Sequence, residues 1–415
     1  MAEGRLQAGV AEREITPPLG SVLIGELGER TAASVRTPLH AKALALADGQ
    51  HTLALVTLDL FGLHEEAIAD LLSAVETETG LPPAAVMVVC SRTRGGPDTM
   101  TPAGWAVHRE RVLPRVTEAV AAARGGLGDA SLGAGRACLP HLFYNHRLLT
   151  RNLNTVTAWL GIPPNEVLAP EGPVDPMVRV IVVRDARNHL LAWLWHAGGD
   201  NRFTADDRIS ADLPALVQEA MDARLGVHVP GLYLPGCIGN VSFHGGLEAV
   251  ADAVASAVMA VSVETSSDPR VQLGCGRRRV VLPVRGAALK RSLADIAAKR
   301  LEALPYYERE IAALQAAGTT AIPAAVQLWR LGRTTLVGLP GAPFAELGLA
   351  LAERLGPDVL VVGNVNGHPG PAMFRPSYLR GGLETWPDRL ARLGPGSGEF
   401  LVDQAIGLVA DTRPA

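Results

Sequence analysis

The order of strands and helices along the chain predicts an α/β protein with mixed β-sheets flanked by helices. Short apolar runs alternate with segments whose apolar residues recur at helical spacing, and this alternation is typical of layered α/β folds. Two of the apolar runs, residues 41–47 and 52–59, are joined by an Asp48-Gly49 turn. Such a turn predicts an antiparallel hairpin, so the sheet is expected to be mixed rather than purely parallel.

The elements after this hairpin follow from the same two patterns. Residues 65–79 place Ile68, Leu71, Leu72 and Val75 on one face of a helix. The later elements are expected in this order: a strand at 86–90, a helix at 105–123, a hairpin of strands at 178–183 and 190–195, a helix at 213–225, a strand at 231–234, helices at 247–261, 292–304 and 306–316, paired strands at 326–331 and 335–339, and a helix at 344–355. Proline- and glycine-rich loops at 163–176 and 369–376 are too short for flexible linkers, so one domain is expected over residues 1–415.

Composition excludes several classes of function. A formal charge of −4 argues against binding to nucleic acid or to an acidic membrane, because such binding is favoured by an excess of basic residues. The four cysteines show no CxxC spacing, so neither a zinc knuckle nor a disulfide framework is expected. The N-terminus has no signal-peptide pattern and no apolar stretch is long enough to span a membrane, which predicts a cytoplasmic protein. The oligomeric state is not determined by the sequence.

Polar residues follow four of the expected strands. The loops at the ends of strands commonly carry the functional residues of α/β folds. They include Asp59, the pair Arg92 and Arg94, His196, and Ser242 at the end of a glycine-containing loop. Each also has a purely structural interpretation: Asp59 as a turn residue, the arginines as a solvated pair, and His196 as a core histidine. Ser242 lacks a G-x-S-x-G motif. Taken alone, these residues indicate an α/β enzyme with a small-molecule site.

These segments, in this order, resemble the N-terminal catalytic domain of the neutral/alkaline (non-lysosomal) ceramidase family. The matching positions extend from Ala8 to about Asp411 and comprise Ala8–Pro18, Pro38–Leu46, Leu58-Asp59, Asp175-Pro176, His196, Ile209–Asp212 with Pro214, Val337–Gly348, Asn366-Gly367, Tyr378, Gly381-Gly382 and Glu384. The resemblance implies a ceramidase-like catalytic domain without the C-terminal immunoglobulin-like domain that secreted members add.

Family members that work as ceramidases hydrolyse the amide bond of N-acylsphingosine and use a zinc ion bound by two histidines, a glutamate and a tyrosine. Of that ligand set, His196 remains in this chain. The other matching positions hold residues of different chemistry, namely Arg92, Arg94, Ala342, His368 and Pro371. One imidazole does not hold zinc, and a guanidinium stays protonated and is not a ligand. No metal and no other cofactor is therefore expected.

The replacements suggest a site rebuilt for an anion. The resemblance implies that Arg92 and Arg94 point into the same cavity as His196. It places His146 and Arg147 near the family's active-site arginine, and His368 is expected to add to this group of substrate-binding residues. Guanidinium groups form paired hydrogen bonds with carboxylate or phosphate, and they can also stabilise a developing oxyanion.

Two further positions bear on catalysis. Ser242 stands where some family members carry a functional serine, and the neighbouring aspartate of the family is Asn240 here. His196 or His244 could act as the base, because imidazole titrates near working pH. The sequence therefore predicts a zinc-independent enzyme that acts on an amide or acyl bond of a small anionic substrate. It would be a hydrolase, or a biosynthetic acyl transferase or cyclase. The alternative is a non-catalytic protein whose pocket binds an anionic metabolite.

Overall fold

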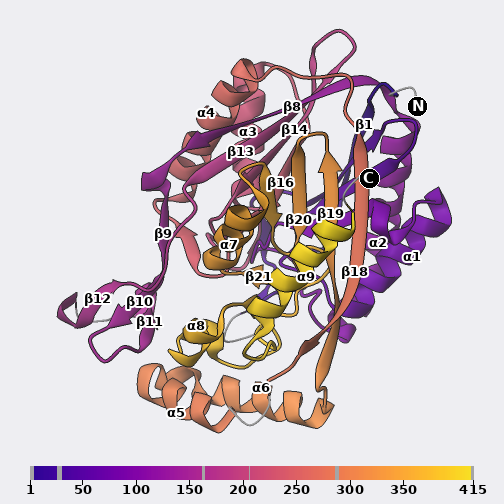
Figure 1. The fold of residues 1–415 in the computed structure, drawn as a ribbon. Helices are drawn as coiled ribbons and strands as arrows, with labels where there is room; N and C mark the ends of the chain where they lie inside the picture. The colour runs from indigo at the N-terminus through magenta and orange to yellow at the C-terminus, as the bar shows by residue number, and fades with distance from the viewer. Residues whose placement is uncertain (1–3, 26–29, 161–163, 205, 286–288, 413–415) are drawn as a thin grey trace.

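The computed structural model describes residues 4–25, 30–160, 164–204, 206–285 and 289–412 (Figure 1). Within these residues the largest sheet has eight strands. In spatial order they are β16 (Gly231–Pro235), β14 (Leu190–Ala197), β13 (Met177–Asp185), β8 (Gly128–Cys138), β1 (Gln7–Glu14), β5 (His40–Ala47), β6 (Thr52–Leu58) and β7 (Val86–Cys90). Strands β5 and β6 form the expected antiparallel hairpin, whereas β6 pairs parallel with β7 and β14 pairs parallel with β16. The predicted mixed sheet is confirmed.

A second sheet of four strands packs on the first. Its order is β18 (Leu273–Pro283), β19 (Ala321–Leu331), β20 (Thr334–Gly338) and β22 (Val359–Val362). Leu194 and Leu232 of the large sheet lie in one buried cluster with Trp329 and Leu360 of the small sheet. Because side chains alternate along a strand, the neighbouring Trp195 faces the other way, into a cluster with the helices behind the large sheet.

Helices cover the outer face of each sheet, so the core has the layers helix, sheet, sheet, helix (Figure 1). Helices α1 (Glu65–Thr79) and α2 (Pro102–Gly125) cover the β5–β7 part of the large sheet, and α3 (Leu213–Leu225) and α4 (Leu247–Glu264) cover its β13–β14 part. Helices α7 (Ala345–Leu355) and α9 (Ser397–Asp411) cover the small sheet. In the described part of the chain, none of the helices has both the length and the apolar character that crossing a bilayer requires.

Further helices and strands complete the fold. The helical ones are α5 (Leu289–Lys299), α6 (Leu304–Ala317), α8 (Arg375–Leu379) and the single turns η3 (Ala158–Leu160), η5 (Leu301–Ala303) and η6 (Leu383–Thr385). The strands are β2 (Val22–Leu23), β3 (Arg30–Thr31), β4 (Ser34–Val35), β9 (Phe143–Asn145), β10 (Arg147–Thr150), β11 (Thr155–Thr157), β12 (Val167–Pro170), β15 (Arg208–Ile209), β17 (Val241–Phe243), β21 (Ala342–Pro343) and β23 (Pro371–Ala372).

Two long strands, β8 and β18, were not predicted. Strand β8 carries Gly133 and Gly135, where a Cβ atom would lie 2.1 Å from the Ser266 carbonyl oxygen and 2.6 Å from the Thr265 hydroxyl. In β18 an added Cβ at Gly276 would lie 2.6 Å from the Thr412 methyl group. Glycine at these positions lets neighbouring chain segments approach the strands closely. The same glycines break the apolar alternation by which a strand is recognised in a sequence.

Candidate functional site

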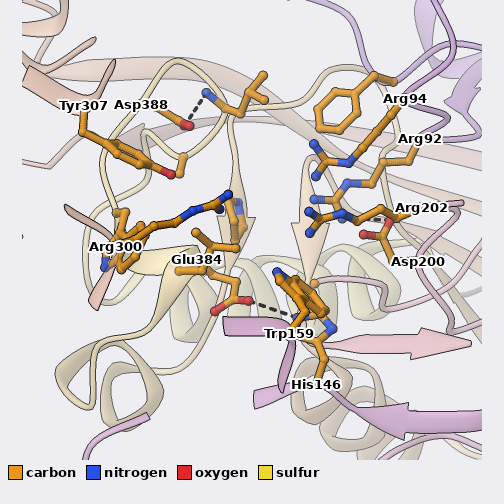
Figure 2. Close-up of a pocket in the computed structure, with 17 residues that line it drawn as sticks. Arg92, Arg94, His146, Trp159, Asp200, Arg202, Arg300, Tyr307, Glu384 and Asp388 are labelled. Atoms are coloured by element: carbon orange, nitrogen blue, oxygen red, sulfur yellow. Dashed lines mark hydrogen bonds and ion pairs between the residues drawn. The ribbon is translucent and has the colours of Figure 1, made fainter. Parts of the chain in front are cut away.

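A pocket opens between the loops that follow β6, β7, β14 and β16 on one side and the C-terminal segment with α5 and α6 on the other (Figure 2). It contains about 700 Å³ of space, part of it open to solvent. The polar residues that line it are Arg92, Arg94, His146, Asp200, Arg202, Arg300, Glu384 and Asp388. Its aromatic residues are Phe61, Trp159, Tyr307 and Trp386.

Two of the predicted substrate-binding residues, Arg92 and Arg94, lie on one wall of this pocket. Each guanidinium carbon is 5.2 Å from the centre of the Phe61 ring, within the range of a cation–π contact. Arg92 has a backbone φ of 64°, and its Nη1 lies 3.2 Å from the Asp200 carboxylate. Phe61 and Asp200 therefore fix the orientation of this part of the wall.

Two more arginines line the pocket, and no pattern in the sequence indicated either of them. The Arg202 guanidinium carbon is 4.5 Å from the centre of the Trp159 ring, close to Arg92 and Arg94 (Figure 2). Arg300 follows α5 on the opposite side of the pocket, where its Nε donates to the Glu302 carboxylate at 3.1 Å. In a chain with thirty-five arginines and three lysines, no local pattern distinguishes these two from the rest.

A chain of hydrogen bonds joins Ser242, His146 and Glu384. Ser242 Oγ is 2.9 Å from His146 Nδ1, and His146 Nε2 is 3.0 Å from the Glu384 carboxylate. His146 and Glu384 line the pocket; Ser242 is partly exposed and is not one of the lining residues, but its backbone pairs in a β-bridge with pocket-lining Asp200. The Trp159 ring lies against His146, with 4.8 Å between the ring centres. This arrangement has the connectivity of a serine–histidine–carboxylate triad.

Arg147 holds the Glu384 carboxylate in its charged form. Burial alone would raise the pKa of Glu384, but the Arg147 guanidinium and the His146 hydrogen bond outweigh burial and lower that pKa to about 2. An ionised Glu384 accepts a hydrogen bond, so His146 carries its proton on Nε2. The unprotonated Nδ1 then faces the Ser242 hydroxyl and can accept its proton.

Arg147 was expected to bind substrate, but its side chain is fully buried and does not line the pocket. Its guanidinium donates to the carboxylates of Glu171 and Glu384 and to the carbonyl oxygens of Ser377 and Gly381. These bonds engage the guanidinium on all sides. Arg147 therefore orients Glu384 rather than contacting a molecule in the pocket.

His196 and His368 also lie outside the pocket lining. His196 Nε2 is 3.0 Å from the Val361 carbonyl oxygen, and burial together with the nearby Arg179 lowers the pKa of His196 to about 4. His368 Nδ1 is 2.9 Å from the Asn364 side-chain oxygen, and its ring stands edge-on behind Phe61. Burial and the charges of nearby arginines lower the pKa of His368 well below its usual value. The expectation that these histidines share the cavity of Arg92 does not match their positions.

Asn240, the third predicted catalytic residue, caps a helix. Its side-chain oxygen accepts a hydrogen bond from the Ala345 N–H at the start of α7, and its amide nitrogen donates to the Glu346 carboxylate, both at 2.8 Å. An asparagine can serve both partners at once, whereas an aspartate would place a negative charge against Glu346. This geometry gives Asn240 a structural task and leaves it no role as a base.

The residues present do not fit the zinc ion of working ceramidases. At the positions where the resemblance places ligands, Arg92 and Arg94 are cationic, Ala342 has no donor atom, and His196 is directed at a backbone carbonyl. Across the residues that the structure describes, no group of three or more histidine, cysteine, aspartate or glutamate side chains is placed to hold a metal ion.

Comparison with known proteins identifies the fold. No protein-family model matches the chain, and no curated protein matches its sequence. Among solved structures, the chain is similar to the neutral ceramidase from Pseudomonas aeruginosa, with a TM-score of 0.72 and 15% identity over 100% of this chain and 76% of that one. It is also similar to a ceramidase complexed with C2, with a TM-score of 0.69 and 14% identity over 99% of this chain and 76% of that one. The fold of this protein is ceramidase-like.

Proposed function

We propose that this protein, on its ceramidase-like fold, is a metal-independent enzyme that cleaves or transfers an acyl group at an amide bond of a small anionic substrate. The observation that carries the proposal is the hydrogen-bonded chain of Ser242, His146 and Glu384 at the edge of an arginine-lined pocket. A hydroxyl that can pass its proton to an imidazole, which is in turn oriented by a carboxylate, is the arrangement of an activated nucleophile.

The first half of the reaction forms an acyl-enzyme. Ser242 Oγ attacks the carbonyl carbon while its proton passes to His146 Nδ1, 2.9 Å away. The carbonyl oxygen takes up the negative charge, and cationic side chains on the pocket wall stabilise it. When the C–N bond breaks, the proton on Nδ1 passes to the leaving amine. Glu384 stabilises the imidazolium that exists between these two transfers.

The second half releases the acyl group from Ser242. His146 Nδ1 removes a proton from water, or from the amine or hydroxyl group of an acceptor, and the resulting nucleophile attacks the ester carbonyl. The C–O bond to Ser242 breaks, and the serine recovers its proton from Nδ1. Water gives hydrolysis, a second molecule gives acyl transfer, and an acceptor on the same molecule gives cyclisation. All three reactions use the same residues.

The arginines supply the anion preference. Arg92, Arg94 and Arg202 lie on one wall of the pocket, and Arg92 contacts the Asp200 carboxylate. Guanidinium groups match the geometry of carboxylate and phosphate oxygens. The same wall also supports the second candidate function, which is binding of an anionic metabolite without turnover.

The test uses chelator-treated protein. A panel of N-acyl amino acids measures hydrolysis, and a fluorophosphonate probe with mass spectrometry reports whether a serine is activated. We expect the probe to label Ser242 and Ser242→Ala to lose hydrolysis, while Ser73→Ala, on the exposed face of α1, changes neither. Hydrolysis that appears only after zinc is added, or that survives Ser242→Ala unchanged, contradicts the proposal. Binding of the acyl amino acids with no turnover favours the second candidate.

A further inference from the structure

We infer that the substrate of this pocket carries a short, flat apolar group, such as a phenyl ring, next to the reacting amide bond. This group binds on the apolar side of the pocket, by which we mean the surface formed by Leu383, Trp386, Leu390, Ala391 and Tyr307. The inference rests on the proposed function and names the class of substrate, which is an aromatic amide with an anionic end rather than an amide with a long alkyl chain.

Aromatic side chains are concentrated at this pocket. They make up 4% of the chain, yet four of the 17 lining residues that Figure 2 draws are aromatic, namely Phe61, Trp159, Tyr307 and Trp386. Phe61 and Trp159 contact arginines of the far wall, whereas Tyr307 and Trp386 pack against each other on the apolar side. Aromatic rings offer a rigid apolar surface, which favours a flat apolar group of the ligand.

The apolar side ends in tightly packed rings. Tyr307 and Trp386 stand edge-on with 5.4 Å between their ring centres, and they are only 5% and 1% exposed. Behind them Tyr306 and Ile296 belong to the same buried cluster, and the Trp386 Nε1 donates to Asp295 of α5 at 2.8 Å. Because packed interiors hold little free volume, a long alkyl chain would have to displace these rings, whereas a short flat group lies in front of them.

The charged residues on this side do not favour an anion. Arg300 is already paired with Glu302, because its Nε donates to that carboxylate at 3.1 Å. Two carboxyl groups, those of Glu384 and Asp388, also line the pocket here (Figure 2). An anionic group of the ligand would be repelled by these carboxyls. The group that binds on the apolar side is therefore uncharged.

The apolar side adjoins the reactive groups. Leu383 directly precedes Glu384 in η6, and the Glu384 carboxylate lies 3.0 Å from His146 Nε2. Across the pocket, the Trp159 and His146 rings are in contact, with 4.8 Å between their centres (Figure 2). A flat group bound between Leu383 and Trp159 would hold its adjoining amide bond beside His146, and such placement of the reacting bond accelerates attack.

The first experiment measures binding apart from turnover. Ser242→Ala protein is titrated by calorimetry with four amides that share one carboxylate: N-acetylglycine, N-benzoylglycine, N-acetylphenylalanine and N-decanoylglycine. We expect N-benzoylglycine or N-acetylphenylalanine to bind at least tenfold more tightly than N-acetylglycine, because burial of a phenyl ring contributes that much or more. The tighter of the two shows whether the ring belongs to the acyl or to the amine part. N-decanoylglycine should bind less tightly than this aromatic compound.

Variants of two neighbouring tyrosines locate the bound ring. Tyr307 and Tyr306 both lie in α6 and are buried in the same cluster, but of the two only Tyr307 is among the described residues that line the pocket. In the Ser242→Ala background, Tyr307→Leu should weaken binding of the preferred aromatic compound about tenfold and leave N-acetylglycine binding unchanged. Tyr306→Leu, the matched control, should change neither.

A third variant keeps the test decisive if Tyr307→Leu does not fold. Leu390 is half-buried and lines the pocket, so Leu390→Trp should fill the apolar side and abolish the aromatic preference. The inference is overturned by equal binding of N-acetylglycine and both aromatic compounds, by tightest binding of N-decanoylglycine, or by an aromatic preference that survives Leu390→Trp.

Failure of the proposed function gives a different result. An aromatic preference that Leu390→Trp abolishes, in a wild-type protein that cleaves none of the four amides, overturns the enzyme proposal and leaves the apolar side standing as a binding site. Cleavage of N-acetylglycine or N-decanoylglycine in preference to both aromatic amides overturns the inference and leaves the enzyme proposal standing.

Discussion

Two buried histidines lie in regions of opposite character. His146 lies between a serine hydroxyl and a carboxylate and lines the pocket. His196 lies between the two sheets, where its Nε2 meets a backbone carbonyl and burial and Arg179 lower its pKa to about 4. The first histidine faces the pocket, whereas the second has a lowered pKa that keeps it neutral and lies away from the pocket.

This difference shows that a matching sequence position does not ensure a matching task. His196 occupies the position that the resemblance assigns to a zinc ligand, yet the residues that would complete a ligand set are replaced. The buried His196 side chain packs between the two sheets, with its Nε2 at hydrogen-bond distance from the Val361 carbonyl oxygen. The polar chemistry is concentrated instead around His146, where Glu384 and Ser242 are within hydrogen-bond distance of its two nitrogens.

The largest effect is expected from the arginine that supports the His146 region. Arg147→Gln would leave the buried carboxylates of Glu171 and Glu384 without their main counter-charge. Loss of one partner of a buried ion pair costs about 3–5 kcal/mol, so the free energy of unfolding should fall by that amount in urea denaturation. Arg380→Gln is the matched control, because Arg380 also pairs with Glu171 but is 40% exposed. Its loss should cost less than about 1 kcal/mol. Equal effects of the two variants would contradict this account of Arg147.

The next prediction separates the two histidines directly. His146→Ala should lower turnover about 100-fold or more, because the base is removed, and it should also lower the free energy of unfolding, because the buried Glu384 carboxylate loses a hydrogen bond. His196→Ala should leave turnover within a few-fold and lower the free energy of unfolding by about 1–3 kcal/mol, because a buried carbonyl loses its partner. Steady-state kinetics and urea denaturation on both variants give the comparison. If His196→Ala abolishes turnover and His146→Ala does not, His196 is the base.

A smaller effect, with opposite signs, is expected from two carboxyls of the pocket. Arg147 and His146 overcome burial and lower the pKa of Glu384 to about 2, whereas burial and the nearby Glu310 raise the pKa of Asp388 to about 6. A lowered pKa stabilises the fold above the unfolded value, near 4, and this contribution is lost as pH falls toward 2. A raised pKa stabilises the fold below about 4, and that contribution is lost as pH rises through 6.

The corresponding amide variants test these signs. Relative to wild type, Asp388→Asn should gain stability as pH rises from 4 to 6, because the asparagine never ionises in its buried site. Glu384→Gln should lose relative stability as pH rises from 2 to about 4.5. Urea denaturation across this pH range measures both slopes. Slopes of the same sign would contradict the environment described for Glu384 or the one described for Asp388.

The smallest expected effect is that of zinc. Because the residues around Arg92 and His196 do not fit a zinc ion, chelator treatment should change neither the melting temperature nor turnover. Added zinc at low micromolar concentration should not bind in a 1:1 ratio. Metal analysis by mass spectrometry and thermal unfolding measure this. One tightly bound zinc per chain, accompanied by a rise in melting temperature, would show that the residues around His196 do bind zinc.

Much of the fold follows from local patterns in the sequence. Helices α1 and α3 have the predicted bounds, and the hairpin of β5 and β6 lies where the Asp48-Gly49 turn places it. Strands β8 and β18 escaped prediction because close approach of neighbouring segments requires glycine in them. Local sequence reports periodicity and turns. It does not report which segment will lie against a strand from the far end of the chain.

The candidate site was predicted in part. Arg92, Arg94 and His146 line the pocket, and Ser242 contacts His146. Arg202 and Arg300 were missed, because an arginine-rich sequence gives no local sign of which arginines converge. Glu384 was recognised as a matching position without a role, since its partners His146 and Arg147 are 238 and 237 residues away along the chain.

The sequence by itself determined the mixed α/β architecture and the identity of the residues at the positions where the resemblance places zinc ligands, because hydrophobic periodicity and residue identity are local properties. Tertiary structure decided which polar residues meet. It brought Ser242, His146 and Glu384 into hydrogen-bond distance, placed Arg300 opposite Arg202, and buried Arg147, His196 and His368 away from the pocket. These outcomes depend on how distant segments pack and on which side chains must be satisfied once water is excluded, and neither is encoded in a single stretch of sequence.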